Sequence, residues 1–181
     1  MTAKLVTKPE PRPSILAVAQ TLGQRFARQA EKADEEDCFV ADNYAVLKTW
    51  GLVEAGVPKE LGGGGAELAE LADMLRVLAH HCSSTALAFS MHTHQVAIPA
   101  WRWKNQKVAA VEPLLKRIVA ERLILLSSGG SDWIAGSGRA ARVEGGYSIN
   151  ARKIFTSGAP AGDLLMTGAV LEEDGQEPMV L

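Results

Sequence analysis

The sequence predicts an α+β fold: an all-α N-terminal helical domain over residues 14–121, then the beginning of an antiparallel β domain over residues 122–181. Before Arg122, apolar residues recur at the three- and four-residue spacing of amphipathic helices. After Arg122, they fall in short runs separated by glycine-containing turns, which is typical of strands. Residues 1–13 contain prolines that resist helix formation, and we expect a flexible arm there.

Five helices are expected in the N-terminal domain. They cover residues 15–30, 41–50, 66–81, 84–98 and 106–120. Ser14 can cap the first helix, and the second should turn Tyr44, Leu47 and Trp50 inward. The fourth is small and apolar almost all round, which predicts burial on every face. Pro113 should either kink the fifth helix or mark its true start.

The expected strands are short. They cover residues 123–126, 139–144, 147–150 and 164–170, and a polar turn follows at 172–177. Gly145-Gly146 between the second and third predicts a hairpin. Residues 178–181 resemble the beginning of a further strand. A closed barrel or sandwich needs more strands than these. We therefore expect the sequence to be a fragment of a longer protein.

Composition excludes several functions. The 19 basic and 21 acidic residues give a net charge of -2, without the basic surplus that nucleic-acid binding requires. No apolar run approaches the ~20 residues that span a bilayer, so neither nucleic acid nor membrane is an expected partner. Cys38 and Cys82 stand alone, without a Cys-x-x-Cys pattern, which favours a reducing cytoplasm over a disulfide framework.

Three motifs stand out from this background. Residues 52–65 form an apolar run, a turn at Pro58 and four glycines that open a helix. No Lys-Ser/Thr follows the glycines, so they are not a phosphate-binding P-loop, and close backbone packing is the simpler interpretation. The other two motifs are Gly130-Ser131-Asp132 and the segment from Lys153 through Phe155 to Gly158.

Together, in this order, the three motifs resemble the acyl-CoA dehydrogenase family over nearly the whole chain from about Ser14. The resemblance implies a flavin cofactor, FAD, with the last two motifs facing it. An aromatic face and a hydroxyl donor suit a flavin ring, which has an apolar face and a polar edge. The cofactor-binding residues that the resemblance implies are Leu125, Ser127, Gly130, Ser131, Phe155 and Ser157. From spacing alone, a surface turn is the better interpretation of Gly130-Ser131, and a buried aromatic at a strand end is a common interpretation of Phe155; only the resemblance favours the flavin.

Two reactions follow from the resemblance. The first is α,β-dehydrogenation of an acyl thioester by a homo-oligomeric enzyme whose catalytic base, a glutamate, lies in a C-terminal domain; no catalytic residue is therefore assigned here. The second is monooxygenation with reduced FMN or FAD as co-substrate. Residues 127–132 lack the Glu-Pro of the dehydrogenases and are two residues shorter, which bears on the substrate more than on the flavin. A non-catalytic interaction fragment is the third possibility.

His92 and His94 are the remaining candidates. Their spacing of two suits a metal pair on a strand but not on a helix, where ligands recur at three or four, so no metal site is expected. On the predicted fourth helix, one histidine should satisfy itself by hydrogen bonding while the other faces a cavity. In related flavin monooxygenases a histidine in this region can line the pocket, which makes His92 the candidate pocket residue.

Overall fold

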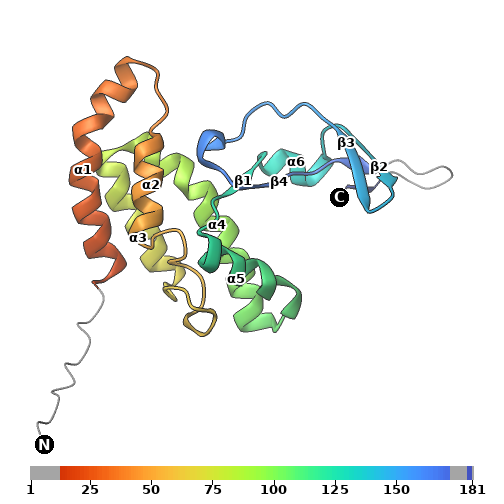
Figure 1. Ribbon diagram of the computed structural model, residues 1–181, viewed down its shortest axis with the longest axis horizontal. Helices are drawn as coiled ribbons and strands as arrows, with labels where there is room; N and C mark the ends of the chain where they lie inside the picture. Colours follow the sequence, from red (N-terminus) through yellow and green to blue (C-terminus); the bar gives the residue numbers. More distant parts are fainter. Residues whose placement is uncertain (1–12, 172–178, 181) are drawn as a thin grey trace, which may run out of the picture.

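The computed structural model describes residues 13–171 and 179–180. A helical layer makes up the N-terminal part, and a smaller strand-containing part extends from its side (Figure 1). The helices are α1 (Ile15–Glu35), α2 (Ala41–Thr49), α3 (Leu68–His81), α4 (Ser83–Gln106) and α5 (Glu112–Glu121), with short 3-10 turns η1 (Lys59–Leu61) and η2 (Ala109–Val111). The predicted fold class is confirmed.

Local signals explain most helix boundaries. The Ser14 side chain accepts a hydrogen bond from the backbone N–H of Ala17 and caps α1, as predicted. Pro113 marks the start of α5 instead of kinking it, because a first-turn proline has no intrahelical N–H to lose. α4 runs eight residues beyond its predicted end at Ile98, straight through Pro99. Pro99 and Ala100 are both buried, and this packing offsets the missing backbone hydrogen bond.

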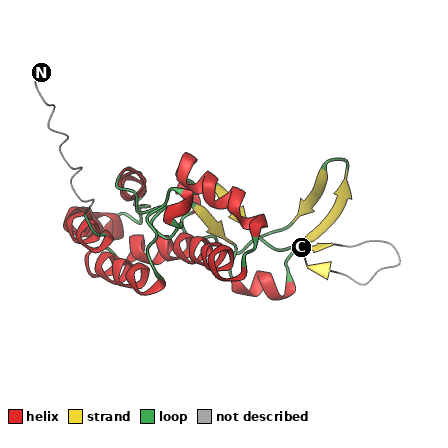
Figure 2. Ribbon diagram, turned by 90° about the horizontal axis from the view of Figure 1, so that it is seen from below, coloured by secondary structure: helices red, strands yellow, loops and turns green. Residues whose placement is uncertain are grey.

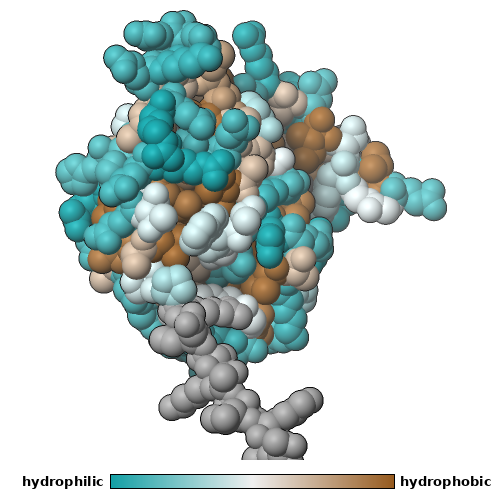
Figure 3. All heavy atoms as spheres, turned by 60° about the vertical axis from the view of Figure 1, so that its left-hand side comes forward, coloured by the Kyte–Doolittle hydropathy of each residue, from teal (hydrophilic) through white to brown (hydrophobic). Residues whose placement is uncertain are grey.

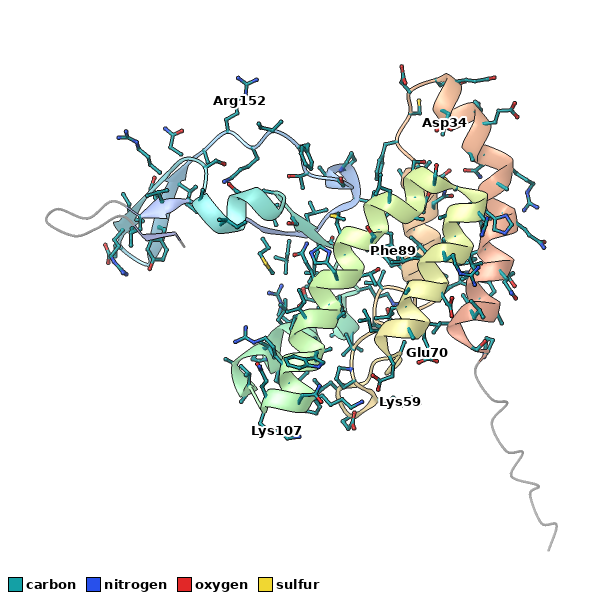
Figure 4. The ribbon with its side chains drawn as sticks, turned by 180° about the vertical axis from the view of Figure 1, so that it is seen from behind. Asp34, Lys59, Glu70, Phe89, Lys107 and Arg152 are labelled. Atoms are coloured by element: carbon teal, nitrogen blue, oxygen red, sulfur yellow. The ribbon has the colours of Figure 1, made fainter. Side chains whose placement is uncertain are left out.

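The helical core lies where α1, α3 and α4 pack on one another. Its fully buried large side chains include Phe26, Leu47, Met74, Leu78, Phe89 and Leu115. Phe89, labelled in Figure 4, stacks on the His92 ring with centroids 5.2 Å apart and meets Tyr44 edge-on at 6.3 Å. Outside this core, the face dominated by the helices is largely hydrophilic, with apolar atoms showing between the polar ones (Figure 3).

Two expectations about burial are wrong. Trp50 follows α2 and is 47% exposed, although Tyr44 and Leu47 are buried as predicted. α4 is buried on one face only, because Leu87, Ile98 and Trp101 leave a stripe of exposed apolar side chains on the other. Periodicity reports which residues are apolar, whereas the neighbouring elements decide which of them are covered.

The glycines at 62–65 pack against the chain that precedes them. Each of their four N–H groups donates to a backbone carbonyl of residues 54–59, at 2.8–3.1 Å. A side-chain carbon on Gly63 would overlap the Val57 backbone, and one on Gly64 would press on Ala55. The expected close packing is confirmed, and these donors are already used within the loop.

The strand-containing part begins with β1 (Leu125–Ser127), α6 (Gly130–Ala135), β2 (Arg139–Val143) and β3 (Gly146–Asn150). It continues with η3 (Ala159–Ala161), β4 (Leu164–Met166), β5 (Val170–Leu171) and β6 (Met179–Val180). The predicted hairpin of β2 and β3 is confirmed, and it projects away from the helices (Figure 2). The predicted turn at 172–177 lies outside the described residues.

The strand pairing is mixed, not wholly antiparallel. β1 pairs with β4 in parallel, and β2 pairs with β5 in parallel, while β2–β3 and β5–β6 are antiparallel. A parallel pair needs a long crossover connection, and α6 with the hairpin supplies it between β1 and β4. The predicted strand at 164–170 is split in two at Gly168, whose N–H and carbonyl bond the side chains of Asp132 and Lys153 instead of a neighbouring strand.

Two polar contacts join the two parts of the chain. Asp163, just before β4, accepts hydrogen bonds from the Lys48 ammonium of α2 and from the Ile124 backbone N–H, both at 2.7 Å. His92 of α4 connects the backbone at Val53 to that at Leu125 in β1. Both contacts end on the chain around β1, and so they fix the strand that carries the candidate site against the helices.

Candidate functional site

The candidate site lies at the end of β1, where the chain turns into α6. Gly129 has a φ of 99°, a left-handed conformation that favours glycine. Its N–H donates to the Ser127 hydroxyl oxygen at 3.2 Å, which closes the turn. The Ser128 hydroxyl donates inward to Asp132. The outer side of the turn is open, since nothing lies within 4 Å of a carbon added at Gly130.

Asp132 is the buried centre of a polar network beneath this turn. Asp132 is only 5% exposed to solvent. Its carboxylate accepts hydrogen bonds from the hydroxyls of Ser128, Ser137 and Thr167, from the Gly168 N–H at 3.1 Å, and from the Lys153 ammonium. Burial acts to raise the pKa of Asp132, but the hydrogen bonds from Lys153, the hydroxyls and Gly168 outweigh it and hold that pKa far below the usual range.

Lys153 connects this network to the second predicted motif. Its ammonium lies 2.7 Å from an Asp132 carboxylate oxygen and also donates to both the carbonyl and the hydroxyl of Ser137 and to the Gly168 carbonyl. Only 13% of its side chain is exposed. The Asp132–Lys153 ion pair therefore joins the motif at 130–132 to the motif at 153–158. Both charged groups are fully hydrogen-bonded.

Phe155 lies beside the turn at the end of β1. Its ring edge comes within 3.8 Å of the position that a carbon on Gly129 would occupy, and its side chain is 66% exposed. Ser157 is half-buried and precedes the buried Gly158. The structure thus brings Gly130 and Phe155 to one exposed edge, with an aromatic face next to open backbone. Ser127 is buried beneath this edge, and its hydroxyl accepts from the Gly129 N–H.

The remaining predicted residues fall elsewhere. Leu125 is buried, and its N–H donates to Nδ1 of His92 at 3.0 Å. The Ser131 side chain lies outside the described part of the structure. His92 is 1% exposed, and its Nε2 donates to the Val53 carbonyl at 2.8 Å. Because both of its ring nitrogens bond the backbone in the core, His92 is the self-satisfied histidine and does not open onto a pocket. His94 is half-buried, with Nδ1 3.1 Å from the Ser90 carbonyl.

The buried His92 makes stability depend on pH. Burial lowers its pKa to about 4, whereas the unfolded chain has the ordinary value near 6.5. As pH falls, the unfolded chain therefore binds the proton first, and the free energy of unfolding decreases between about pH 6.5 and pH 4. We expect wild type to lose about 2 kcal/mol through this residue between pH 7 and pH 5. Urea unfolding at both pH values measures the loss.

His92→Gln is expected to remove most of this pH dependence, although it lowers stability at pH 7. His80→Gln, at an exposed position near the end of α3, is the matched control and should keep the wild-type pH profile. An unchanged profile in His92→Gln would contradict the assignment.

Sequence reasoning missed the network around Asp132. A signal was present, because each motif contains one charged residue of opposite sign, Asp132 and Lys153. Their pairing depends on a parallel crossover that brings β4 beside β1, and no local pattern predicts which strands become neighbours.

A second concave surface lies at the C-terminal end of α4, away from the middle of this helix, where His92 meets β1. It is a pocket of about 500 Å³ between α4 and the chain from Gly56 to Leu71. Trp101 and Ile98 line it, and the ion pair of Lys104 with Glu67, at 2.6 Å, lies at its rim. Figure 4 shows Lys59, another lining residue, at this end of the helical layer.

Two kinds of feature are absent from the described residues. No helix there is long and apolar enough to cross a membrane. No group of three or more His, Cys, Asp or Glu side chains there is placed to hold a metal ion.

Comparison with known proteins identifies the family. Residues 14–116, more than half of the chain, match the family described as "Acyl-CoA dehydrogenase, N-terminal domain". The chain belongs to the acyl-CoA dehydrogenase family. The matched region covers α1 to α4 and the first half of α5, and the site at the end of β1 follows it.

Relatives within this family catalyse different reactions. The chain is 28% identical to the oxygenase component of p-hydroxyphenylacetate 3-hydroxylase from Acinetobacter baumannii, over 86% of this chain and 34% of that protein. It is 27% identical to mitochondrial isovaleryl-CoA dehydrogenase from Solanum tuberosum, over 84% of this chain and 37% of that protein.

Solved structures share the fold. A complex of TdsC, a dibenzothiophene monooxygenase from Paenibacillus sp. A11-2, with FMN and indole superimposes with a TM-score of 0.77 at 22% identity, covering 91% of this chain and 40% of that one. The chain spans between a third and two fifths of the length of these relatives.

Proposed function

We propose that the chain forms part of a flavin-dependent oxidoreductase and that the exposed edge at the end of β1 holds the flavin. One observation carries the proposal: the open turn at Gly129–Gly130 and the exposed ring of Phe155 lie side by side. Relatives named as a hydroxylase, a monooxygenase with FMN and an acyl-CoA dehydrogenase support it.

The residues present fit a flavin. Phe155 offers an aromatic face for the ring, and the half-buried Ser157 offers a hydroxyl for its polar edge. At Gly129 and Gly130 the absence of side chains lets a ligand approach the backbone closely. A bound flavin supplies the redox chemistry, while these residues bind it and orient its ring. Leu125 would contribute only by supporting β1 from the core.

We propose monooxygenation with externally reduced flavin, FMN or FAD, as the reaction. This reverses the order expected from the sequence alone. Ser127, Ser128 and Asp132 have buried side chains, and the Asp132 carboxylate is neutralised by Lys153. This turn therefore leaves no acidic group facing a substrate, and a neutral aromatic substrate suits such a surface.

Dehydrogenation of an acyl thioester, with FAD as acceptor, is the second candidate. The similarity to isovaleryl-CoA dehydrogenase favours it. Under either reaction we propose that residues 14–121 act as a helical domain, that the rest of the site comes from sequence outside residues 1–181, and that the active form is a homo-oligomer.

Anaerobic spectroscopy separates the two reactions. The protein, with any sequence that continues its reading frame past Leu181, is loaded with flavin and titrated with short-, medium- and branched-chain acyl-CoAs. A monooxygenase keeps its flavin oxidised and then consumes oxygen only when reduced flavin is supplied. Bleaching of the flavin by an acyl-CoA without a reductase would overturn the monooxygenase proposal and establish the dehydrogenase.

Substitutions at the exposed edge test the cofactor site. Ser157→Ala should weaken flavin binding by about 1 kcal/mol, the contribution of one hydrogen bond. Phe155→Ala should weaken it more, because contact area with the ring is lost as well. Fluorescence titration with FMN and with FAD measures both effects. Ile154→Ala is the matched control, since this neighbouring side chain is 94% exposed. Equal affinity in all three variants would contradict the site.

A further inference from the structure

The loop that carries Phe155 and Ser157 has one anchor near its start. Within residues 151–155, Lys153 is half-buried and the other four residues are exposed. Within the described part of the chain, the hydrogen bonds made by residues 151–155 all come from the Lys153 ammonium. The position of this part of the loop therefore depends on what Lys153 binds.

Lys153 binds three segments on the opposite side of the site. Its partners are the Asp132 carboxylate of α6, the Ser137 residue after that helix, and the Gly168 carbonyl between β4 and β5. Asp132 in turn accepts from Ser128, the residue before Gly129. A continuous chain of polar contacts thus leads from the loop to the turn at the end of β1.

The two ends of this chain lie next to each other, because the edge of the Phe155 ring is 3.8 Å from the position of a carbon added at Gly129. Phe155 follows Lys153 by two residues, and Gly129 precedes Asp132 by three. We propose that Asp132 and Lys153 are a positioning pair that holds the Phe155 ring beside the Gly129–Gly130 turn, and thereby sets the surface on which the flavin rests. The inference rests on the proposed function, but the placement of Phe155 is testable without any flavin.

Lys153→Met tests whether the Lys153 ammonium positions Phe155. Methionine keeps a long apolar stem but has no charge and no N–H donors. Asp132 keeps its donors from Ser128, Ser137, Thr167 and Gly168. Arg152→Met is the matched control, because it removes a cation from the adjacent position, where the side chain is exposed and points away from the site (Figure 4).

Fluorine NMR on the full 181-residue chain reads the position of Phe155 directly. Labelling with 4-fluorophenylalanine gives four resonances, since the chain has four phenylalanines. Phe155→Ala assigns the resonance of interest, and the fully buried Phe26 and Phe89 report on the global fold. In Lys153→Met, we expect the Phe155 resonance to narrow and move toward its value in urea while those of Phe26 and Phe89 stay in place. Arg152→Met should match wild type.

Flavin titration of the same variants completes the test. Lys153→Met is expected to raise the flavin dissociation constant about tenfold, close to the effect of Phe155→Ala, while Arg152→Met leaves it unchanged. An unmoved Phe155 resonance in Lys153→Met, or equal movement of all four resonances, would overturn the positioning role. The titration uses the protein with any sequence that continues its reading frame past Leu181. If that wild-type protein binds no flavin, the proposed function fails, and the fluorine spectra still decide whether the pair positions Phe155.

Ser137→Ala keeps the inference testable if Lys153→Met does not fold. It removes a hydroxyl that bonds both members of the pair and leaves their direct contact intact. The Phe155 resonance should move in the same direction by a smaller amount, and an unchanged spectrum would count against the proposal.

Discussion

Replacing Asp132 by alanine is expected to lower the free energy of unfolding by about 3 kcal/mol, because it leaves the Lys153 ammonium without its counter-charge in a mostly buried site. The hydroxyls of Ser128, Ser137 and Thr167 and the Gly168 N–H lose their acceptor at the same time. Urea denaturation followed by circular dichroism at pH 7 measures the change.

Asp34→Ala is the control for this prediction. Asp34 lies near the end of α1 with its side chain exposed (Figure 4), and its loss should change stability by no more than about 0.5 kcal/mol. The pKa of Asp132 is held below its unfolded value, so its contribution is fully present above about pH 4 and is lost only as pH falls further. Equal losses in the two variants would show that the network adds nothing to stability.

Gly63→Ala is expected to destabilise the protein by about 2 kcal/mol or more, through overpacking. The added carbon would overlap the Val57 backbone, which cannot rotate aside as a side chain can. The N–H groups of Gly63 and Gly65 that bond Pro58 and Val57 would be strained in the same movement. Thermal and urea unfolding should both shift.

Gly146→Ala provides the matched glycine control. It lies at the start of β3, where nothing stands within 4 Å of an added carbon and φ is not in the left-handed region. We expect a change within about 0.5 kcal/mol there. A stable Gly63→Ala would mean that the glycine-rich segment does not need its close backbone contact.

Local sequence signals determined most of the helical part. Apolar spacing located all five helices, Ser14 marked the start of α1 and Pro113 the start of α5. Gly145-Gly146 located the hairpin. These features depend on hydrogen bonds and side-chain contacts between residues close in sequence, so a single stretch of chain contains the information that specifies them.

Tertiary structure alone decided the rest. The exposed face of α4, the burial of His92 and the break at Gly168 all depend on which distant segment lies alongside. The candidate site shows the same division. The sequence selected Gly130, Phe155 and Ser157 as separate motifs, but only the parallel pairing of β1 with β4 places Asp132 beside Lys153 and Phe155 beside Gly129. Burial and charge pairing are properties of segments brought together in space, and no local pattern specifies them.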